Sequence, residues 1–208
     1  MPLAEKLFEH SACIVEGFVP FVKEVSVIVQ RNGHGETYCL PVGENIHVHH
    51  ILHETIVPAR ITKGTESQAE IEAAKIADYL NLVGTLAVEM FVLEDESIVI
   101  NELAPRPHNS GHYSMEACNI SQFAQHIRAV CGWPLRKPKL WSPTIMVNVL
   151  GQHVVPLINS INKYPNWSIH LYGKSEAKLN RKMGHVTVMT EDLEGTLRQI
   201  EEAGIWSE

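Results

Sequence analysis

The sequence lacks the features by which membrane proteins and nucleic-acid-binding proteins are usually recognised. No apolar run approaches the roughly 18 residues that a membrane-spanning helix needs. Positive charge is also in deficit, because 17 Lys and Arg face 24 Asp and Glu, which gives a net charge of -7. A nucleic-acid-binding protein usually presents a basic face. We therefore expect neither a membrane nor a nucleic acid among the partners.

Cysteine is scarce, and its spacing predicts neither a disulfide framework nor a CxxC metal or redox motif. The four residues are Cys13, Cys39, Cys118 and Cys131. Residues 1–10 carry Glu5 and Glu9 in an amphipathic stretch, which is not the pattern of a secretion signal. A reduced, cytoplasmic protein with buried thiols is the interpretation that fits best. Hydrophobic residues at 45% and charged residues at 20% indicate a globular chain rather than a disordered one.

The first third of the chain shows mainly the β-branched, alternating pattern of strands. We predict strands over Cys13–Phe21, Val25–Arg31, Glu36–Leu40, Ile46–Leu52 and Glu54–Ile61. Asn32-Gly33 predicts a hairpin between the second and third of these. The period then changes, and Thr65–Leu80 is predicted to be a helix with Thr65 or Ser67 as its cap.

The rest of the chain alternates between strands and helices. A hairpin is predicted over Val83–Leu103, a helix over Ile120–Cys131 and a proline-rich linker over Pro134–Pro143. The elements predicted after it are strand Thr144–Leu150, helix Val154–Tyr164, strands Ser168–Leu171 and His185–Met189, and helix Leu193–Ala203. We predict the α+β class with a mainly antiparallel sheet, divided into domains at residues 1–133 and 134–208.

The predicted hairpin places two carboxylates face to face. If it is symmetric about Asp95-Glu96, Glu89 lies directly opposite Glu102, with their Cβ atoms about 4.5–5.5 Å apart. Two like charges there destabilise the sheet, and Mg²⁺ would offset the repulsion because it prefers carboxylate oxygens. Alternatively, one Glu reaches solvent or pairs with Arg106 or Lys75. A slip of one residue would break the pairing, so the inference depends on the turn.

The segment after the hairpin, residues 104–112 (APRPHNSGH), is stiffened by two prolines and rich in polar groups. Arg106 can hold a carboxylate or phosphate through two hydrogen bonds, which suits anion positioning beside a metal site. The alternative is a rigid surface loop whose Arg pairs with acids. Taken alone, His108 and His112 are better interpreted as hydrogen-bonded structural residues than as catalysts.

Two further clusters have both a functional and an ordinary interpretation. The stretch His47-Val48-His49-His50 suggests zinc, but successive residues on a strand alternate faces, so we do not predict zinc there. A second cluster contains Lys174, Lys178, Arg181 and Lys182. It either binds an anion or forms a solvated basic loop.

Several strings, taken together, resemble one family. Residues 16–29 (EGFVPFVKEVSVIV), 88–91 (VEMF) and 101–112 (NELAPRPHNSGH) resemble the ATP-grasp core of the N5-carboxyaminoimidazole ribonucleotide synthetases. Residues 172–174 (YGK) and 181–185 (RKMGH) are similar to the signature of their carboxy-terminal domain. The resemblance implies an ATP-grasp carboxy-terminal subdomain, an antiparallel sheet with flanking helices, followed by a small α/β domain.

The resemblance also implies an activity. Members of this family use ATP to phosphorylate bicarbonate, and the resulting carboxyphosphate carboxylates aminoimidazole ribonucleotide during purine biosynthesis. The implied partners are ATP, bicarbonate and aminoimidazole ribonucleotide, with Mg²⁺ (or Mn²⁺) as cofactor. Glu89 and Glu102 are implied as the metal ligands.

Further positions acquire roles from the resemblance alone. Those implied for ATP binding are Glu16, Val19, Glu24, His47, Asn101 and Glu102. In this set, Glu16 and Val19 form the hinge at the adenine edge, and Glu24 accepts the ribose hydroxyls. Asn101 points to the opposite face of the predicted strand, but at the strand end it lies adjacent to the phosphates.

The same resemblance implies the groups that act on the acceptor. Arg106 would stabilise carboxyphosphate, with His108 as a second catalytic candidate. The cations implied to hold the ribonucleotide phosphate are Lys174, Arg181 and Lys182.

The sequence also departs from the family pattern. The family begins with a nucleotide-fold domain and a small subdomain whose glycine-rich loop covers the ATP phosphates. No G-x-G-x-x-G and no glycine-rich segment precedes Cys13. We therefore expect an incomplete chain that keeps the metal ligands and the adenine hinge but does not turn over alone. Apolar surface left without its cover predicts a homodimer.

Two other functions remain open from the sequence. Another ATP-grasp ligase, such as a glycinamide ribonucleotide synthetase or a formate-dependent transformylase, would share Glu89 and Glu102. A non-catalytic structural or regulatory fragment is the third hypothesis, which the intact Glu89, Glu102 and Arg106 disfavour.

Overall fold

The computed structural model describes residues 12–207, and within them nine strands form one antiparallel sheet. The strand order is β6-β5-β1-β3-β4-β7-β9-β8, and β2 pairs with β1 beside this path. The amphipathic stretch expected at residues 1–10 lies outside the described residues. In the described part of the chain, no helix is both long enough and apolar enough to cross a bilayer. The predicted α+β class with an antiparallel sheet and flanking helices is confirmed.

The elements follow the chain in two groups. The first contains the strands β1 (Lys23–Arg31), β2 (Thr37–Cys39), β3 (Gly43–Val48), β4 (Ile51–Val57), β5 (Gly84–Val92) and β6 (Ile98–Ala104), and the helices α2 (Lys63–Tyr79), α3 (Ser114–Ala117) and α4 (Gln122–Val130). The second contains β7 (Thr144–Leu150), α5 (Val154–Ser160), β8 (Ser168–Leu171), β9 (Lys182–Met189) and α6 (Leu193–Glu202). Short 3-10 turns occur at η1 (Asn109–Gly111), η2 (Gly151–His153) and η3 (Ile161–Lys163).

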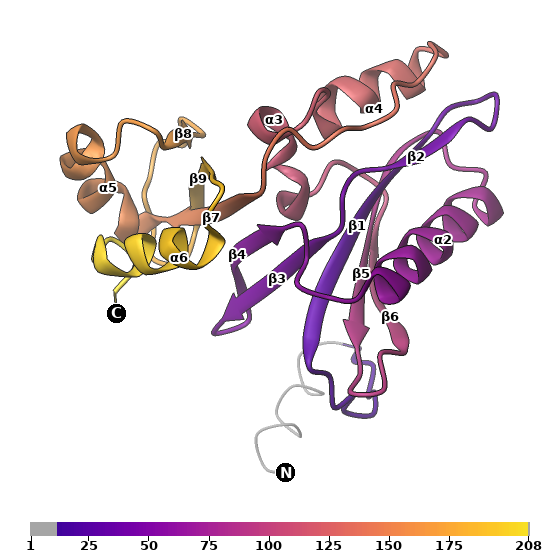
Figure 1. Cartoon of the computed structure of the whole chain (residues 1–208), viewed down its shortest axis with the longest axis horizontal. Helices are drawn as coiled ribbons and strands as arrows, with labels where there is room; N and C mark the ends of the chain where they lie inside the picture. The colour runs from indigo at the N-terminus through magenta and orange to yellow at the C-terminus, as the bar shows by residue number, and fades with distance from the viewer. Residues whose placement is uncertain (1–11, 208) are drawn as a thin grey trace.

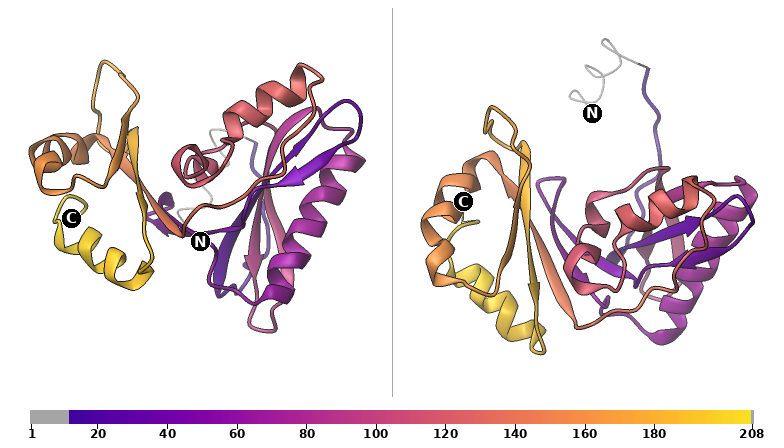
Figure 2. Two further views of the ribbon diagram at one scale, coloured as in Figure 1. Left: turned by 45° about the horizontal axis from the view of Figure 1, so that its top comes forward. Right: turned by 90° about the horizontal axis from the view of Figure 1, so that it is seen from above.

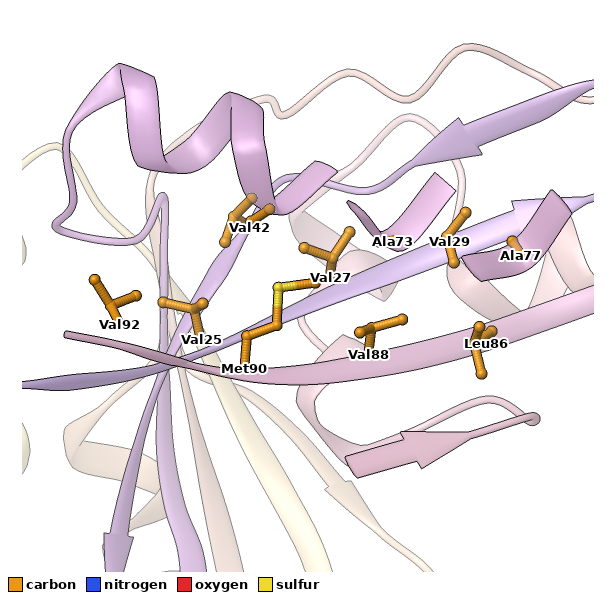
Figure 3. Close-up of a cluster of buried hydrophobic side chains, with 11 residues drawn as sticks. Val25, Val27, Val29, Val42, Ala73, Ala77, Leu86, Val88, Met90 and Val92 are labelled. Carbon is orange, nitrogen blue, oxygen red and sulfur yellow. The ribbon is translucent and has the colours of Figure 1, made fainter. Parts of the chain in front are cut away.

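Helix α2 covers one face of the sheet through a stripe of small residues. Ala69, Ala73 and Ala77 recur every four residues, so they share one helix face and are fully buried. They pack against the valines of β1 and β5, as Figure 3 shows for Ala73 and Ala77. The helix cap is Thr62, whose side chain accepts a hydrogen bond from the Thr65 amide. The predicted cap at Thr65 or Ser67 was therefore wrong, because the helix begins two residues earlier than its apolar period does.

Strand β7 joins the two groups of elements into one sheet. It pairs with β4 on one side and with β9 on the other, and Figures 1 and 2 show it running from one group into the other. Met146 of β7 packs with Ile28 and Tyr113 of the first group in a single buried cluster. The expected division into residues 1–133 and 134–208 stays a prediction, since one sheet extends through both parts.

The predicted strand Cys13–Phe21 is wrong. Residues 12–22 are described, but none of them belongs to a strand, and Ile14 and Phe18 are each 88% exposed. Strand propensity mainly reflects packing on a half-buried pleated surface. This segment has the composition of a strand but no neighbouring strand to pair with. The predicted strand Ile46–Leu52 is also wrong, because β3 ends at Val48 and β4 begins at Ile51, with His49 and His50 in the turn between them. The other predicted strands and helices are present, and both Thr144–Leu150 and Ser168–Leu171 have the predicted bounds.

Gly184 allows β8 and β9 to approach closely, and we expect Gly184→Ala to destabilise the fold. A Cβ atom at this position would lie 2.2 Å from the backbone carbonyl oxygen of His170. Because backbone must move to relieve the contact, we expect a loss of about 2–3 kcal/mol in the free energy of unfolding by urea. The matched control is Gly33→Ala in the β1–β2 loop, where nothing lies within 4 Å of the added atom. Equal urea midpoints for the two variants would contradict this account.

Candidate functional site

Three adjacent strands place carboxylates on one face of the sheet. Glu89 of β5 is paired with Ser26 of β1 on one side and with Glu102 of β6 on the other. Glu24 lies two residues before Ser26, so its side chain projects from the same face. Figure 1 shows β1, β5 and β6 side by side. Glu24, Glu89 and Glu102 therefore form one cluster, called here the acidic cluster.

The register that opposes Glu89 and Glu102 was predicted correctly, but the turn was not. The Leu93 amide bonds the Ser97 carbonyl, which leaves a three-residue loop centred on Asp95. Met90 therefore pairs with Ile100, whereas Glu89 pairs with Glu102, so Asn101 has no partner in the ladder. Such a bulge redirects side chains next to it. Asn101 thus interrupts the strict alternation of side chains expected for this strand.

Within the described residues, no lysine or arginine offsets the charges of Glu89 and Glu102 through an ion pair. Burial, followed by Glu102 and then Glu24, raises the pKa of Glu89, while Lys182 and Arg106 act in the opposite direction. Among residues 12–207, no Lys or Arg forms an ion pair with Glu89 or Glu102, and Lys75 pairs with Glu72 instead. Adjacent carboxylates that repel one another fit the all-oxygen preference of a divalent cation such as Mg²⁺.

The loop that carries Arg106 and His108 is held by a buried residue that the sequence did not reveal. Gln122, the first residue of α4, is fully buried. Its side-chain oxygen accepts a hydrogen bond from the His108 amide at 2.9 Å, and its nitrogen donates to the His108 carbonyl at 2.7 Å. The same nitrogen lies 2.9 Å from Nδ1 of His112. A fully buried glutamine at a helix start has no signature in the sequence, because its partners are distant in the chain.

Arg106 and His108 differ in their surroundings. Arg106 is exposed, and its guanidinium donates to the carbonyl of Pro107 at 3.1 Å. His108 is largely buried, with its Nδ1 2.9 Å from the Ser110 hydroxyl and 3.7 Å from a Glu89 carboxylate oxygen. Burial, then Arg106 and Lys182, lowers the pKa of His108 to about 4. The imidazole is therefore neutral at pH 7 and can accept a proton.

Lys182 brings the second group of elements to the acidic cluster. Its Nζ donates to the Asn109 side chain at 3.3 Å. Burial lowers the pKa of Lys182. The negative charge of Glu89, which has the largest effect among the neighbouring charges, raises it. Asn109 in turn exchanges two side-chain hydrogen bonds with Asn148 of β7, of 2.9 and 2.6 Å. Asn109 and Asn148 were not selected from the sequence, because only the folded sheet brings them together.

The other two predicted phosphate-binding cations lie farther out. Lys174 donates to the backbone carbonyl of Lys182 at 2.6 Å, and Arg181 donates to that of Glu176 at 3.2 Å. Both side chains are exposed. The structure thus places Lys174 beside the Lys182 backbone, while the Lys182 side chain binds Asn109 and lies close enough to Glu89 to influence its pKa.

The residues implied for the nucleotide are only partly brought together. The Glu24 carboxylate of β1 contacts Nδ1 of His47 of β3, and both residues line an open groove beside Phe21 and Asn45. Glu16 is exposed in the extended segment before β1, and no contact described for residues 12–207 joins it to the acidic cluster. Val19 accepts a hydrogen bond from the Phe21 amide at 3.0 Å.

The buried histidines predict that acid destabilises the fold. Burial lowers the pKa values of His108 and His112 to about 4, so the unfolded chain binds more protons between pH 4 and 6.5. The contribution of these two histidines to the free energy of unfolding is therefore fully present above pH 6.5. It is lost as the pH falls towards 4, by about 1.4 kcal/mol per pKa unit for each histidine. Glu89, with a raised pKa, acts in the opposite direction.

The slope of stability against pH, measured by urea unfolding, isolates this effect. We expect His108→Gln to flatten the slope between pH 6.5 and 4, whatever it does to stability at pH 7. His34→Gln, on the exposed β1–β2 loop, is the control and should keep the original slope. A slope that His108→Gln leaves unchanged would show that His108 is not the group that takes up the proton.

Comparisons with known proteins identify families that this chain matches. Residues 2–123 match the ATP-grasp domain family, and residues 144–199 match the phosphoribosylaminoimidazole carboxylase C-terminal domain family. The chain is 50% identical over 200 residues to the N5-carboxyaminoimidazole ribonucleotide synthase of Bacillus subtilis (strain 168), covering 96% of this chain and 53% of that protein. It is 45% identical over 192 residues to the synthase of the same name from Staphylococcus aureus (strain COL), covering 92% of this chain and 51% of that protein.

Solved structures show the same likeness. The ADP complex of an N5-carboxyaminoimidazole ribonucleotide synthetase superposes with a TM-score of 0.97 at 53% identity, covering 99% of this chain and 54% of that one. The Aspergillus clavatus synthase in complex with ADP and 5-aminoimidazole ribonucleotide superposes with a TM-score of 0.91 at 32% identity, covering 97% of this chain and 55% of that one. The chain spans about half the length of the curated relatives it matches. It belongs to the ATP-grasp family, and it resembles a carboxy-terminal part of the N5-carboxyaminoimidazole ribonucleotide synthetases.

Proposed function

We propose that this chain supplies the metal, nucleotide and acceptor-phosphate side of a ligase that carboxylates aminoimidazole ribonucleotide in purine biosynthesis. The reaction consumes ATP and bicarbonate and forms ADP and phosphate through carboxyphosphate. One observation carries the proposal: Glu89 and Glu102 are directly opposed, with Lys182 and Arg106 close enough to influence the pKa of Glu89. The names of the relatives supply the substrate class.

On this proposal, Glu89 and Glu102 hold Mg²⁺ or Mn²⁺. When bound, the cation neutralises charge on the transferred phosphoryl group. Asn101, redirected by the bulge, provides an amide beside Glu102 for the ATP phosphates. Glu24 and His47 hold the nucleoside, with Glu16 and Val19 at the adenine edge. The groove beside Glu24 and His47 supports this placement.

The groups that act on the acceptor lie on the loop held by Gln122. The Arg106 guanidinium is exposed and can bind the carboxylate of carboxyphosphate through two hydrogen bonds. When the amine nitrogen attacks the carboxyphosphate carbon, the bond from that carbon to the phosphate oxygen breaks and phosphate leaves. His108, which is neutral at pH 7, accepts the proton that the amine loses. Lys174, Arg181 and Lys182 hold the ribonucleotide phosphate.

The chain alone is expected to be inactive, because the family's phosphate-covering loop is not recognisable in its sequence. The test is to join it behind the amino-terminal part of the Bacillus subtilis relative and to measure ADP formation. We expect ADP that depends on both bicarbonate and aminoimidazole ribonucleotide from the joined protein and none from the chain alone. Ribonucleotide-dependent ADP formation by the chain alone would contradict the proposed incompleteness.

The same assay separates the alternatives. Turnover with glycinamide ribonucleotide instead of aminoimidazole ribonucleotide would favour another ATP-grasp ligase of purine synthesis. A folded joined protein without activity on either would favour a non-catalytic fragment.

A homodimer is also part of the proposal. Exposed apolar side chains on the segment before β1, above all Ile14 and Phe18, support it because such surface favours association. Light scattering at micromolar concentration should give about twice the mass of one chain. The mass of a single chain at every micromolar protein concentration tested would contradict the proposed homodimer.

A further inference from the structure

A second cluster of metal-ligating side chains lies apart from the acidic cluster. His170 of β8 and His185 of β9 are directly opposed residues, and their rings stack with centroids 4.6 Å apart and planes 17° from parallel. Glu116 of α3 completes the group. One ligand atom from each of the three residues lies within 4.8 Å of the other two. Opposed positions on neighbouring strands are close enough for two side chains to share one ligand.

Two buried atoms of this cluster lack a partner. Glu116 uses one carboxylate oxygen, which lies 2.7 Å from Nε2 of His170, but its other oxygen is buried and unpaired. His185 lies 2.9 Å from the Tyr172 hydroxyl through Nδ1, while its Nε2 is buried and unpaired. Buried polar atoms are almost always satisfied, so two such atoms within one cluster of metal-ligating residues point to a bound species.

We propose that Glu116, His170 and His185 form a zinc site that clamps α3 to the β8–β9 hairpin. Two imidazoles and one carboxylate are a ligand set typical of Zn²⁺, whereas Mg²⁺ prefers oxygen ligands throughout. The unpaired oxygen of Glu116 and Nε2 of His185 each supply a free lone pair. His170 supplies Nε2 by carrying its ring proton on Nδ1 instead, which its partly exposed side chain allows through solvent exchange. No proton is gained or lost overall by that change.

The surrounding hydrogen bonds suit this role. If Nδ1–H of His185 donates to the Tyr172 hydroxyl oxygen, the ring takes the tautomer that presents Nε2 to a metal. Metal-bound histidines commonly have such a partner on the other ring nitrogen. Three protein ligands leave one position for water.

The position of the cluster gives the clamp a consequence. Helix α3 follows the loop that carries Arg106 and His108. The segment between β8 and β9 carries Lys174 and Arg181, and Lys182 is the first residue of β9. A cation shared by Glu116, His170 and His185 would fix these two groups relative to each other. The clamp does not depend on the proposed carboxylation, because its three residues lie outside the acidic cluster and need no substrate to bind the ion.

The experiment is a metal titration of the full chain after chelator treatment and dialysis. Calorimetry with Zn²⁺ should show one tight equivalent, and Co²⁺ should give visible d–d bands of a four-coordinate site. His170→Ala removes one ligand, and Glu116→Gln removes another with little change of shape. Each should weaken Zn²⁺ binding by about 100-fold or more, since losing a group that merely supports a ligand already costs roughly 10–100-fold.

Two control variants locate the bound ion. His34→Ala makes the same side-chain change on an exposed loop, and Glu89→Gln alters the acidic cluster; both should keep the tight equivalent. Zn²⁺ should also raise the unfolding temperature of the unaltered chain but not that of Glu116→Gln, which serves as the test if His170→Ala does not fold. The proposal is overturned if the unaltered chain binds no tight equivalent, which would leave a bridging water as the occupant. It is also overturned if Glu89→Gln abolishes binding or if neither ligand variant weakens it.

Discussion

Glu89→Gln in the joined protein is expected to lower ribonucleotide-dependent ADP formation by about a thousandfold or more. The amide keeps the shape of the side chain but removes one of the two opposed negative charges that would hold the divalent cation. Metal-assisted charge neutralisation contributes several kcal/mol to phosphoryl transfer, and about 1.4 kcal/mol corresponds to a factor of ten. Turnover should be measured by coupled ADP detection across a range of Mg²⁺ concentrations.

The same variant should be at least as stable as the original chain in the absence of metal. Glu102 and Glu24 both raise the pKa of Glu89, so neutralising this position relieves repulsion within the sheet. We expect a gain of up to about 1 kcal/mol in the free energy of unfolding. Glu72→Gln, on the exposed face of α2, is the matched control and should change neither property by much. Loss of activity together with loss of stability would instead indicate a structural role for Glu89.

Arg106→Ala is expected to lower turnover of the joined protein by about 100- to 1000-fold, with little change in the KM for ATP. Removing one preorganised donor from a developing anion typically costs that much. Among residues 12–207, the Arg106 side chain forms no ion pair, and its one hydrogen bond goes to the carbonyl of Pro107 in its own loop. The fold should therefore tolerate the substitution, with an unchanged unfolding midpoint.

Two further variants sharpen this test. Arg106→Lys keeps the charge but loses the paired donors, so it should recover only part of the rate. Arg198→Ala, on the exposed face of α6, removes an arginine far along the chain and should leave turnover unchanged. A large rise in the KM for ATP with unchanged kcat would place Arg106 at the nucleotide instead of at carboxyphosphate.

Local patterns in the sequence predicted most of the elements and the key carboxylate pair. The spacing of apolar residues is enough to locate a strand such as Thr144–Leu150, which is largely buried on both faces. The segment Cys13–Phe21 failed because composition reports propensity and not the presence of a neighbouring strand. The centre of the hairpin turn was predicted between Asp95 and Glu96, whereas the loop is centred on Asp95. The difference arises because a bulge adds one residue to a strand without leaving a recognisable pattern in the sequence.

The contacts that hold the site could not be predicted locally. Gln122 reaches back to His108, Asn109 reaches forward to Asn148, and His170 meets Glu116 across 54 positions of the chain. Each pair is created by the fold, and its members look like ordinary polar residues in their own segments. The opposition of Glu89 and Glu102 was predictable because a single hairpin contains both residues.

The bulge at Asn101 adds a residue that the pairing of β5 with β6 does not require. Met90 pairs with Ile100 and Glu89 with Glu102, so deleting Asn101 would leave a regular ladder with both glutamates still opposed. The sheet has no need of this residue, and bulges usually weaken a ladder. Because the hairpin could omit Asn101 without changing the register of Glu89 and Glu102, we expect its side chain to matter for the proposed site and not for the fold. Position 101 is therefore where a one-residue deletion would report on function while sparing the architecture.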